Sequence, residues 1–187
     1  MSGFSAVPPS MYDPAFTALS ESAQRLEFYI RTCPQRNSEG LSRMRWGAVE
    51  DDLGMPRDVA RTALNELLRA GRPFVYDDRA EVILDKDALR TQPIGRKNVD
   101  PDAWDKDAKH DNRLKAAVAR INDLPRSREL LKHLYIVAES YAPEFARLLA
   151  EEFTDITEPL SEPLLKPLSK GRVEQSREEE SRDERAS

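Results

Sequence analysis

The sequence predicts a mainly α-helical protein of the α+β class, in which a helix-turn-helix is followed by a β-hairpin. Three observations between Glu39 and Arg90 lead to this prediction. A short extended run, GLSRMR, comes before two helical segments that are separated by Gly54. The second helical segment ends at Gly71, and two extended runs follow with turn residues between them. This order of elements is typical of a winged helix-turn-helix domain, which we place at residues 19–90.

The chain before the helix-turn-helix is predicted to contain a flexible N-terminus and one helix. Residues 1–18 are rich in Pro and Ser, and we expect them to be loose until Tyr12–Leu19, whose aromatic residues are expected to pack against the domain. Ser20 is a good N-cap for the first helix, and Pro34 ends that helix. Apolar residues recur at helical spacing on its buried face, namely Ala23, Leu26, Ile30 and Cys33.

Turn residues mark the helix-turn-helix itself. The segment WGAVEDDLG has apolar residues at helical spacing and stops at Gly54, which easily adopts a positive φ. Pro56 suits the first position of the next helix, because its missing N–H would be unpaired there. This helix is predicted to run from Pro56 to about Ala70. Its core face consists of Ala60, Ala63, Leu64, Leu67 and Leu68.

The hairpin that follows is interpreted as the wing. Its two extended runs, PFVYDD and AEVILDK, are joined through Asp77, Asp78 and Arg79. The run GLSRMR is expected to be the short first strand that pairs with this wing.

The rest of the chain is predicted to contain a linker, a helical extension and a tail. Residues 91–101 form the linker. Residues 102–153 contain three helices: one from about Asp102 to Asp123, one capped by Ser127 and one starting at Pro143. They form either a small helical domain or an extension that packs on the winged helix and on a second subunit.

The tail, residues 154–187, begins with the loose repeat EPLS, EPLL, KPLS and ends in EEESRDERAS. Its prolines and charges cannot bury enough apolar surface to offset chain entropy, so we predict disorder. An alternative is that the repeated Pro-Leu steps form a peptide that a partner protein binds.

Composition indicates a cytoplasmic protein with no membrane contact, or one of the host cytoplasm if it is phage-encoded. No apolar run approaches the roughly 20 residues that span a bilayer. The segment MSGFSAVPPSMYDP lacks the basic and apolar regions of a signal peptide. The single cysteine, Cys33, cannot form an internal disulfide and is expected to be an inert core thiol.

Net charge alone does not indicate a nucleic-acid-binding protein, because it is −5 for the 187 residues. The tail holds part of this negative charge, with six basic and nine acidic residues from position 154 onward. Residues 39–97 hold eleven of each sign. DNA affinity therefore depends on whether the arginines gather on one face.

The exposed face of the helix Pro56–Ala70 carries the side-chain types that read DNA. Arg binds guanine with two hydrogen bonds, Asn binds adenine in the same way, and Thr reaches base edges or phosphates. A solvated helix face is the alternative interpretation of the same residues. The candidate DNA-binding residues are Arg43, Arg45, Arg57, Arg61, Thr62, Asn65, Arg69, Arg72 and Arg79.

Neighbouring residues limit this assignment. Arg43 and Arg45 alternate with a methionine, so both point away from the core if they lie in a strand. Trp46 is expected to be a core anchor under the first strand. Asp58 disfavours close contact at the helix start, unless it caps the helix or orients Arg61. The acidic wing tip means that the wing either stays off DNA or reaches it only through Arg72 and Arg79.

No catalytic or metal-binding pattern is present. The run DPDAWDKDAKHD lacks the central glycine and terminal glutamate of a calcium loop, and its aspartates are better suited to a helix N-terminus. His110 and His133 lack the spacing of a zinc pair. There is no Gly-rich phosphate loop and no nucleophile elbow. We therefore expect a binding protein that is not an enzyme and uses no cofactor.

From Asp13 to about Leu124 the chain resembles the winged-helix DNA-binding proteins of phage replication initiation, the replisome-organiser or DnaD-like group. The motifs that carry the resemblance are the Asp13-Pro14 entry with Phe16, LSESAQRLEFY, EGLSRMR, EDDLGM, VARTALNEL, the hairpin FVYDD with VIL, and the later helix that ends Leu124-Pro125. The resemblance implies binding at a phage origin, with the C-terminal part recruiting a replicative helicase or helicase loader. That part is short here and lacks the family's longer recruitment domain.

These observations together predict sequence-specific binding of double-stranded DNA by a homodimer in phage or prophage replication initiation. A winged-helix transcriptional regulator is the nearest alternative, because the same fold serves both uses. A protein-interaction module that does not bind DNA is the second alternative, since the balanced charge of residues 39–97 suits it.

Overall fold

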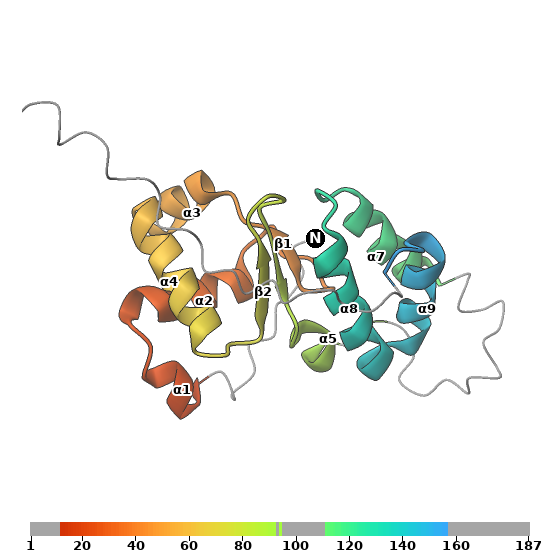
Figure 1. Ribbon diagram of the computed structural model, residues 1–187, viewed down its shortest axis with the longest axis horizontal. Coiled ribbons are helices and arrows are strands. Elements are labelled where there is room, and N and C mark those ends of the chain that lie inside the picture. Colours follow the sequence, from red (N-terminus) through yellow and green to blue (C-terminus); the bar gives the residue numbers. More distant parts are fainter. Residues whose placement is uncertain (1–11, 93, 95–110, 157–187) are drawn as a thin grey trace, which may run out of the picture.

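The computed structural model describes residues 12–92, 94 and 111–156. A three-stranded sheet lies between two groups of helices (Figure 1), which is the mainly helical α+β winged-helix arrangement that the sequence predicts. The first group of helices contains α1 (Pro14–Thr17), α2 (Glu21–Thr32), α3 (Trp46–Leu53) and α4 (Arg57–Arg69). The sheet contains β1 (Leu41–Arg43), β2 (Phe74–Asp77) and β3 (Val82–Asp85). The second group of helices contains α5 (Ala88–Thr91), α7 (Asn112–Asn122), α8 (Arg128–Tyr141) and α9 (Pro143–Glu152).

Local signals in the sequence account for the ends of the helix-turn-helix. The N-cap Ser20 accepts a hydrogen bond from the backbone N–H of Ala23 at 3.2 Å, which starts α2. α3 ends at Gly54, whose φ of 59° is left-handed. Pro56 is the N-cap of α4 rather than its first helical residue, because its ψ of 144° is extended. The helix therefore begins one residue later than predicted.

The sheet has the order β1-β3-β2 and is antiparallel throughout, so the predicted pairing of the first strand with the wing is confirmed. Leu41 of β1 lies opposite Leu84 of β3. At the wing tip, Oδ1 of Asp77 accepts hydrogen bonds from the backbone N–H groups of Arg79 and Ala80 at 2.9 and 3.1 Å. Asp77 therefore shapes the turn, in the manner of an Asx turn.

The two faces of the sheet belong to two different hydrophobic cores. Alternate residues of a strand point to opposite faces. One core packs against α2, α3 and α4 and includes Phe74, Tyr76 and Ile83. The other packs against α7, α8 and α9 and includes Leu41, Val75, Val82 and Leu84. The helical extension thus covers the second face of the sheet of its own chain.

Three predicted boundaries change. One is the extent of the N-terminal segment: it includes the short helix α1, although the burial of Phe16 agrees with the packing expected for Tyr12–Leu19. The helix expected from Asp102 begins, within the described residues, at Asn112, and residues 102–110 lie outside them. Ile156 is buried in the second core, so packing continues past residue 153, while residues 157–187 of the predicted tail lie outside the described part.

Candidate nucleic-acid interface

The predicted DNA-binding residues divide by exposure into three sets. Arg61 and Asn65 on α4 are half-buried, and Arg72 is buried. The exposed set consists of Arg43, Arg45, Arg57, Thr62, Arg69 and Arg79. Eight of the nine candidates therefore keep some surface, and only Arg72 is enclosed.

Arg61 lies where α4, the start of α3 and the wing tip meet. Its Nη2 donates a hydrogen bond to Oδ1 of Asp78 in the wing turn at 2.8 Å. Its guanidinium carbon lies 5.2 Å from the ring centroid of Trp46, the first residue of α3. Trp46 in turn meets Tyr76 of β2 edge-on, with the ring centroids 5.7 Å apart. Side chains from three elements thus fix the position of one guanidinium.

Three exposed arginines, Arg45, Arg57 and Arg79, flank this junction. Arg45 comes directly before Trp46, and Arg79 comes directly after Asp78. Arg57 lies about one helical turn before Arg61 on α4. Arg43 of β1 lies two residues after Leu41 and pairs with Val82, and both of these belong to the second core, so Arg43 lies on the opposite face of the sheet from Arg61. Contacts between α3, α4 and the wing turn thus bring the positions of Arg45, Arg57 and Arg79 near Arg61. We call this set, Arg45, Arg57, Arg61 and Arg79, the arginine surface.

The acidic residues of the wing tip have definite structural partners. The carboxylate of Asp77 is engaged by two backbone N–H groups of the turn. The carboxylate of Asp78 pairs with Arg61 and accepts a longer hydrogen bond, 3.4 Å, from the Tyr76 hydroxyl. The repulsion that these two residues would exert on phosphate is therefore partly offset by their own partners.

The remaining polar residues of α4 lie further along the helix. The Thr62 hydroxyl donates to the carbonyl oxygen of Asp58 at 2.9 Å. Arg69 is two turns beyond Arg61, or roughly 12 Å along the axis. Between them, Glu66 accepts hydrogen bonds of 2.6 Å from both the backbone N–H and the hydroxyl of Ser20. Glu66 therefore attaches α4 to the start of α2 and does not face a ligand.

Arg72 does not belong to the candidate interface, because its side chain is buried. Its guanidinium donates to both carboxylate oxygens of Glu27, at 2.8 and 2.7 Å, and to Asp13 at 3.0 Å. Hydrogen bonding to Glu27, and then to Asp13, raises the pKa of Arg72. Two carboxylates that precede Arg72 by 45 and 59 residues thus enclose its charge, and no local pattern in the sequence indicates this.

The structure gives two residues a role that the sequence alone did not indicate. Trp46 was expected to be a core anchor, and it is buried, but it also supplies the surface on which Arg61 stacks. Asp78 was interpreted only as an obstacle to phosphate. The equal numbers of acidic and basic residues at positions 39–97 indicate that ion pairs could form there. Only the fold shows that Asp78 pairs with Arg61.

Other candidate groups do not form a reactive site in the described part of the chain. Cys33 is buried, and burial raises the pKa of its thiol. Burial and Lys86 lower the pKa of His133, while His110 lies outside the described residues. No three side chains of the metal-ligating types come together among the residues of known placement. None of the helices described is long and apolar enough to cross a membrane.

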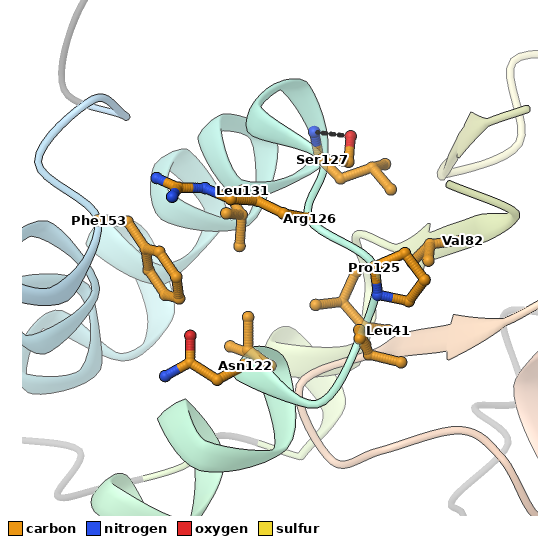
Figure 2. A pocket seen from close by; sticks show the side chains of 11 residues that line it. Leu41, Val82, Asn122, Pro125, Arg126, Ser127, Leu131 and Phe153 are labelled. Carbon is orange, nitrogen blue, oxygen red and sulfur yellow. Dashed lines mark hydrogen bonds between the residues drawn. The ribbon is translucent and has the colours of Figure 1, made fainter. Parts of the chain in front are cut away.

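A cavity of about 130 Å³ lies on the other side of the sheet, between β1, β3 and the α7–α8 connection. Figure 2 shows Pro125, Leu131 and Phe153 around it, with Arg126 and Asn122 as its polar neighbours. Arg126 is already paired with Asp155 at 2.9 Å. The cavity is a gap with a mixed polar and apolar lining between the sheet and the second group of helices.

Comparisons of the chain with protein-family models, with curated protein sequences and with solved structures gave no match.

Proposed function

We propose that this protein binds double-stranded DNA, with the N-terminal half of α4 in the major groove. The observation that supports this most strongly is the arginine surface around Arg61. Its members come from the residue before α3, from α4 and from the wing turn, which are separate in sequence and adjacent in the fold. A helix of 13 residues is about 20 Å long, enough to lie in a groove roughly 12 Å wide.

Each member of the surface suits a particular contact. Arg61 lies in the second turn of α4, within the part of a recognition helix that usually faces base edges. Arg57, the first residue of α4, suits a contact with phosphate. Asn65 follows one turn after Arg61 and is suited to adenine. Arg45 comes directly before α3, and Arg79 extends from the wing, where phosphates would be contacted. These four arginines are the basic residues that the proposal places on DNA.

Binding to a pool of randomised duplex DNA at two salt concentrations tests the proposal. We expect a defined motif to be enriched, with affinity falling as salt rises, because bound arginines release counterions. Arg45→Ala should reduce the slope of log affinity against log salt by about 1. Lys115→Ala is the matched control, because Lys115 is equally charged, exposed and located on α7, beyond the sheet. Absence of binding at low salt would overturn the proposal.

The resemblance in sequence extends this proposal to replication initiation in a phage or prophage, with the protein acting as a homodimer. Capture of partners from host lysate tests the role. Recovery of a replicative helicase or its loader supports initiation, whereas recovery of RNA polymerase supports the transcriptional alternative. Light scattering of the purified protein measures the oligomeric state, and a monomer at working concentration contradicts the dimer.

One observation favours the second candidate function, a protein-interaction module. Arg61, at the centre of the arginine surface, already has a carboxylate partner in Asp78. An acidic segment of a partner protein could bind the exposed arginines in the same way. Under this alternative the randomised pool yields no motif, and Arg45→Ala weakens capture of the protein partner.

A further inference from the structure

Arg61 differs from the other arginines of the surface in how firmly its guanidinium is held. Asp78 accepts a hydrogen bond from Nη2 at 2.8 Å, and the Trp46 ring lies 5.2 Å from the guanidinium carbon. That distance is within the range of a cation–π contact. Asp78 is itself held by the Tyr76 hydroxyl, and Tyr76 packs against Trp46. The four side chains form a closed cluster.

Stability does not account for the ion pair between Arg61 and Asp78. The Arg61 and Asp78 side chains are 29% and 49% exposed, and ion pairs at such exposure contribute little to folding. The effect of the contacts is instead to restrict a long side chain that solvent would otherwise leave mobile. A side chain that is ordered before binding loses less entropy when it binds.

The contact with Asp78 leaves a recognition edge available. Guanidinium has five N–H donors in one plane. Nη2 contributes one hydrogen to the edge that it shares with Nε and one to the edge that it shares with Nη1. A single hydrogen bond from Nη2 to Asp78 therefore occupies only one of these two edges. The other can donate two parallel hydrogen bonds, which is the geometry that matches O6 and N7 of guanine.

We propose that Arg61 reads a guanine in the major groove and that Asp78 is the positioning residue that orients its guanidinium. This inference rests on the proposed DNA binding and names the base that the surface selects. Arg57, which is exposed and lies one turn earlier on α4, contacts phosphate instead. The acidic residue at the wing tip thus contributes specificity at the expense of total affinity.

The test compares four full-length variants with the wild type on the motif selected from randomised duplex DNA. Arg61→Lys keeps the charge but cannot make the paired hydrogen bonds, so discrimination at one G·C pair should fall about 10-fold. Arg57→Lys is its matched control and should change discrimination at every position less than about 2-fold. A motif in which Arg61→Lys alters no guanine position would overturn the inference and leave DNA binding intact.

The other two variants separate positioning from simple charge removal. Asp78→Asn should raise the affinity for unrelated DNA by roughly a few-fold, because it removes one negative charge that repels phosphate. The same variant should lower discrimination at the same G·C pair. Glu81→Gln removes one negative charge from the same hairpin and should raise affinity without changing discrimination. Equal effects of the two variants on discrimination would show that Asp78 does not position Arg61. Failure of the wild type to bind any duplex would overturn both this inference and the proposed function.

Discussion

The arginine surface around Arg61 and the buried ion pairs around Arg72 lie in the same winged helix and use the same residue type for opposite purposes. Arg45, Arg57 and Arg79 of the arginine surface are exposed. Arg31, Arg36 and Arg72 are enclosed by carboxylates. The difference shows that the role of an arginine here is decided by whether the fold brings a buried carboxylate to it.

Glu27 is the centre of the buried region. It is completely buried and pairs with Arg31 at 3.2 Å and with Arg72 at 2.7 Å. Arg31 continues the network to Asp85, which Arg36 also contacts. Burial raises the pKa of Asp85, and the two arginines oppose that shift. We call these five residues the buried network. Each charged side chain of this network is paired with side chains of opposite charge. Removal of one charge therefore leaves its partner with an unpaired charge in an apolar environment.

The largest effect is expected from breaking the buried network at its centre. Glu27→Gln leaves the guanidinium groups of Arg31 and Arg72 without their shared carboxylate. Loss of one partner from a buried ion pair costs about 3–5 kcal/mol of unfolding free energy. Urea unfolding followed by circular dichroism measures it. A loss below about 1 kcal/mol would mean that water or other groups compensate the charges, and that the two regions differ less than their burial indicates.

The next largest effect is expected at Gly40, which leads into β1 beside the buried network. Gly40 has a φ of +87°, and a Cβ there would collide with the Cβ of Ala88 and the carbonyl oxygen of Asp85. Gly40→Ala should therefore lower the unfolding free energy by more than about 2 kcal/mol, from backbone strain and displacement of Asp85. Gly47→Ala on α3 is the control, because nothing lies within 4 Å of its added Cβ. Equal stability of the two variants would contradict this explanation.

A smaller effect, dependent on pH, is expected at the exposed edge of the network. The backbone N–H of Phe16, and then Arg72, lower the pKa of Asp13 below its ordinary value of 3.8. A lowered pKa means that the carboxylate stabilises the fold above that value and that this stabilisation is lost as pH falls through the folded-state pKa. The wild type should therefore be more stable than Asp13→Asn at pH 7, with the difference shrinking below pH 3.8. A difference that is independent of pH would contradict the role of the charge.

The smallest effect on stability is expected at the arginine surface. Arg57→Ala should change the unfolding free energy by less than about 0.5 kcal/mol, as surface substitutions usually do. The same variant should reduce the salt slope of DNA binding by about 1. Urea unfolding and binding at two salt concentrations give both values. A large loss of stability would show that Arg57 is structural and would remove the contrast with Arg72.

Much of the fold could be predicted because its signals are local. Ser20 and Ser127 both accept hydrogen bonds from the backbone at the starts of α2 and α8, as their positions before apolar periodic segments indicate. Gly54 ends α3 in the left-handed conformation that a glycine after a helix predicts. These features depend on residues within a few positions of one another, so the sequence displays them directly.

The candidate interface could be predicted only in part. The exposed side of α4 follows from its periodicity, because the residues opposite its core face must meet solvent or a ligand. Arg72 could not be separated from the other arginines, since Glu27 and Asp13 are distant in sequence. The partnership of Arg61 with Asp78 was equally hidden, because it depends on how the wing turn lies against α4.

The sequence by itself determined the order of the elements, their caps and the apolar stripe of each helix, because these depend on interactions over three or four residues. Only the tertiary structure decided that α7, α8 and α9 cover the second face of the sheet, and which arginines are enclosed and which remain at the surface. The long-range ion pairs of this fold join residues such as Arg61 and Asp78, 17 positions apart, and Glu39 and Arg120, 81 positions apart. Such pairs exist only once the chain has folded, and no local pattern encodes them.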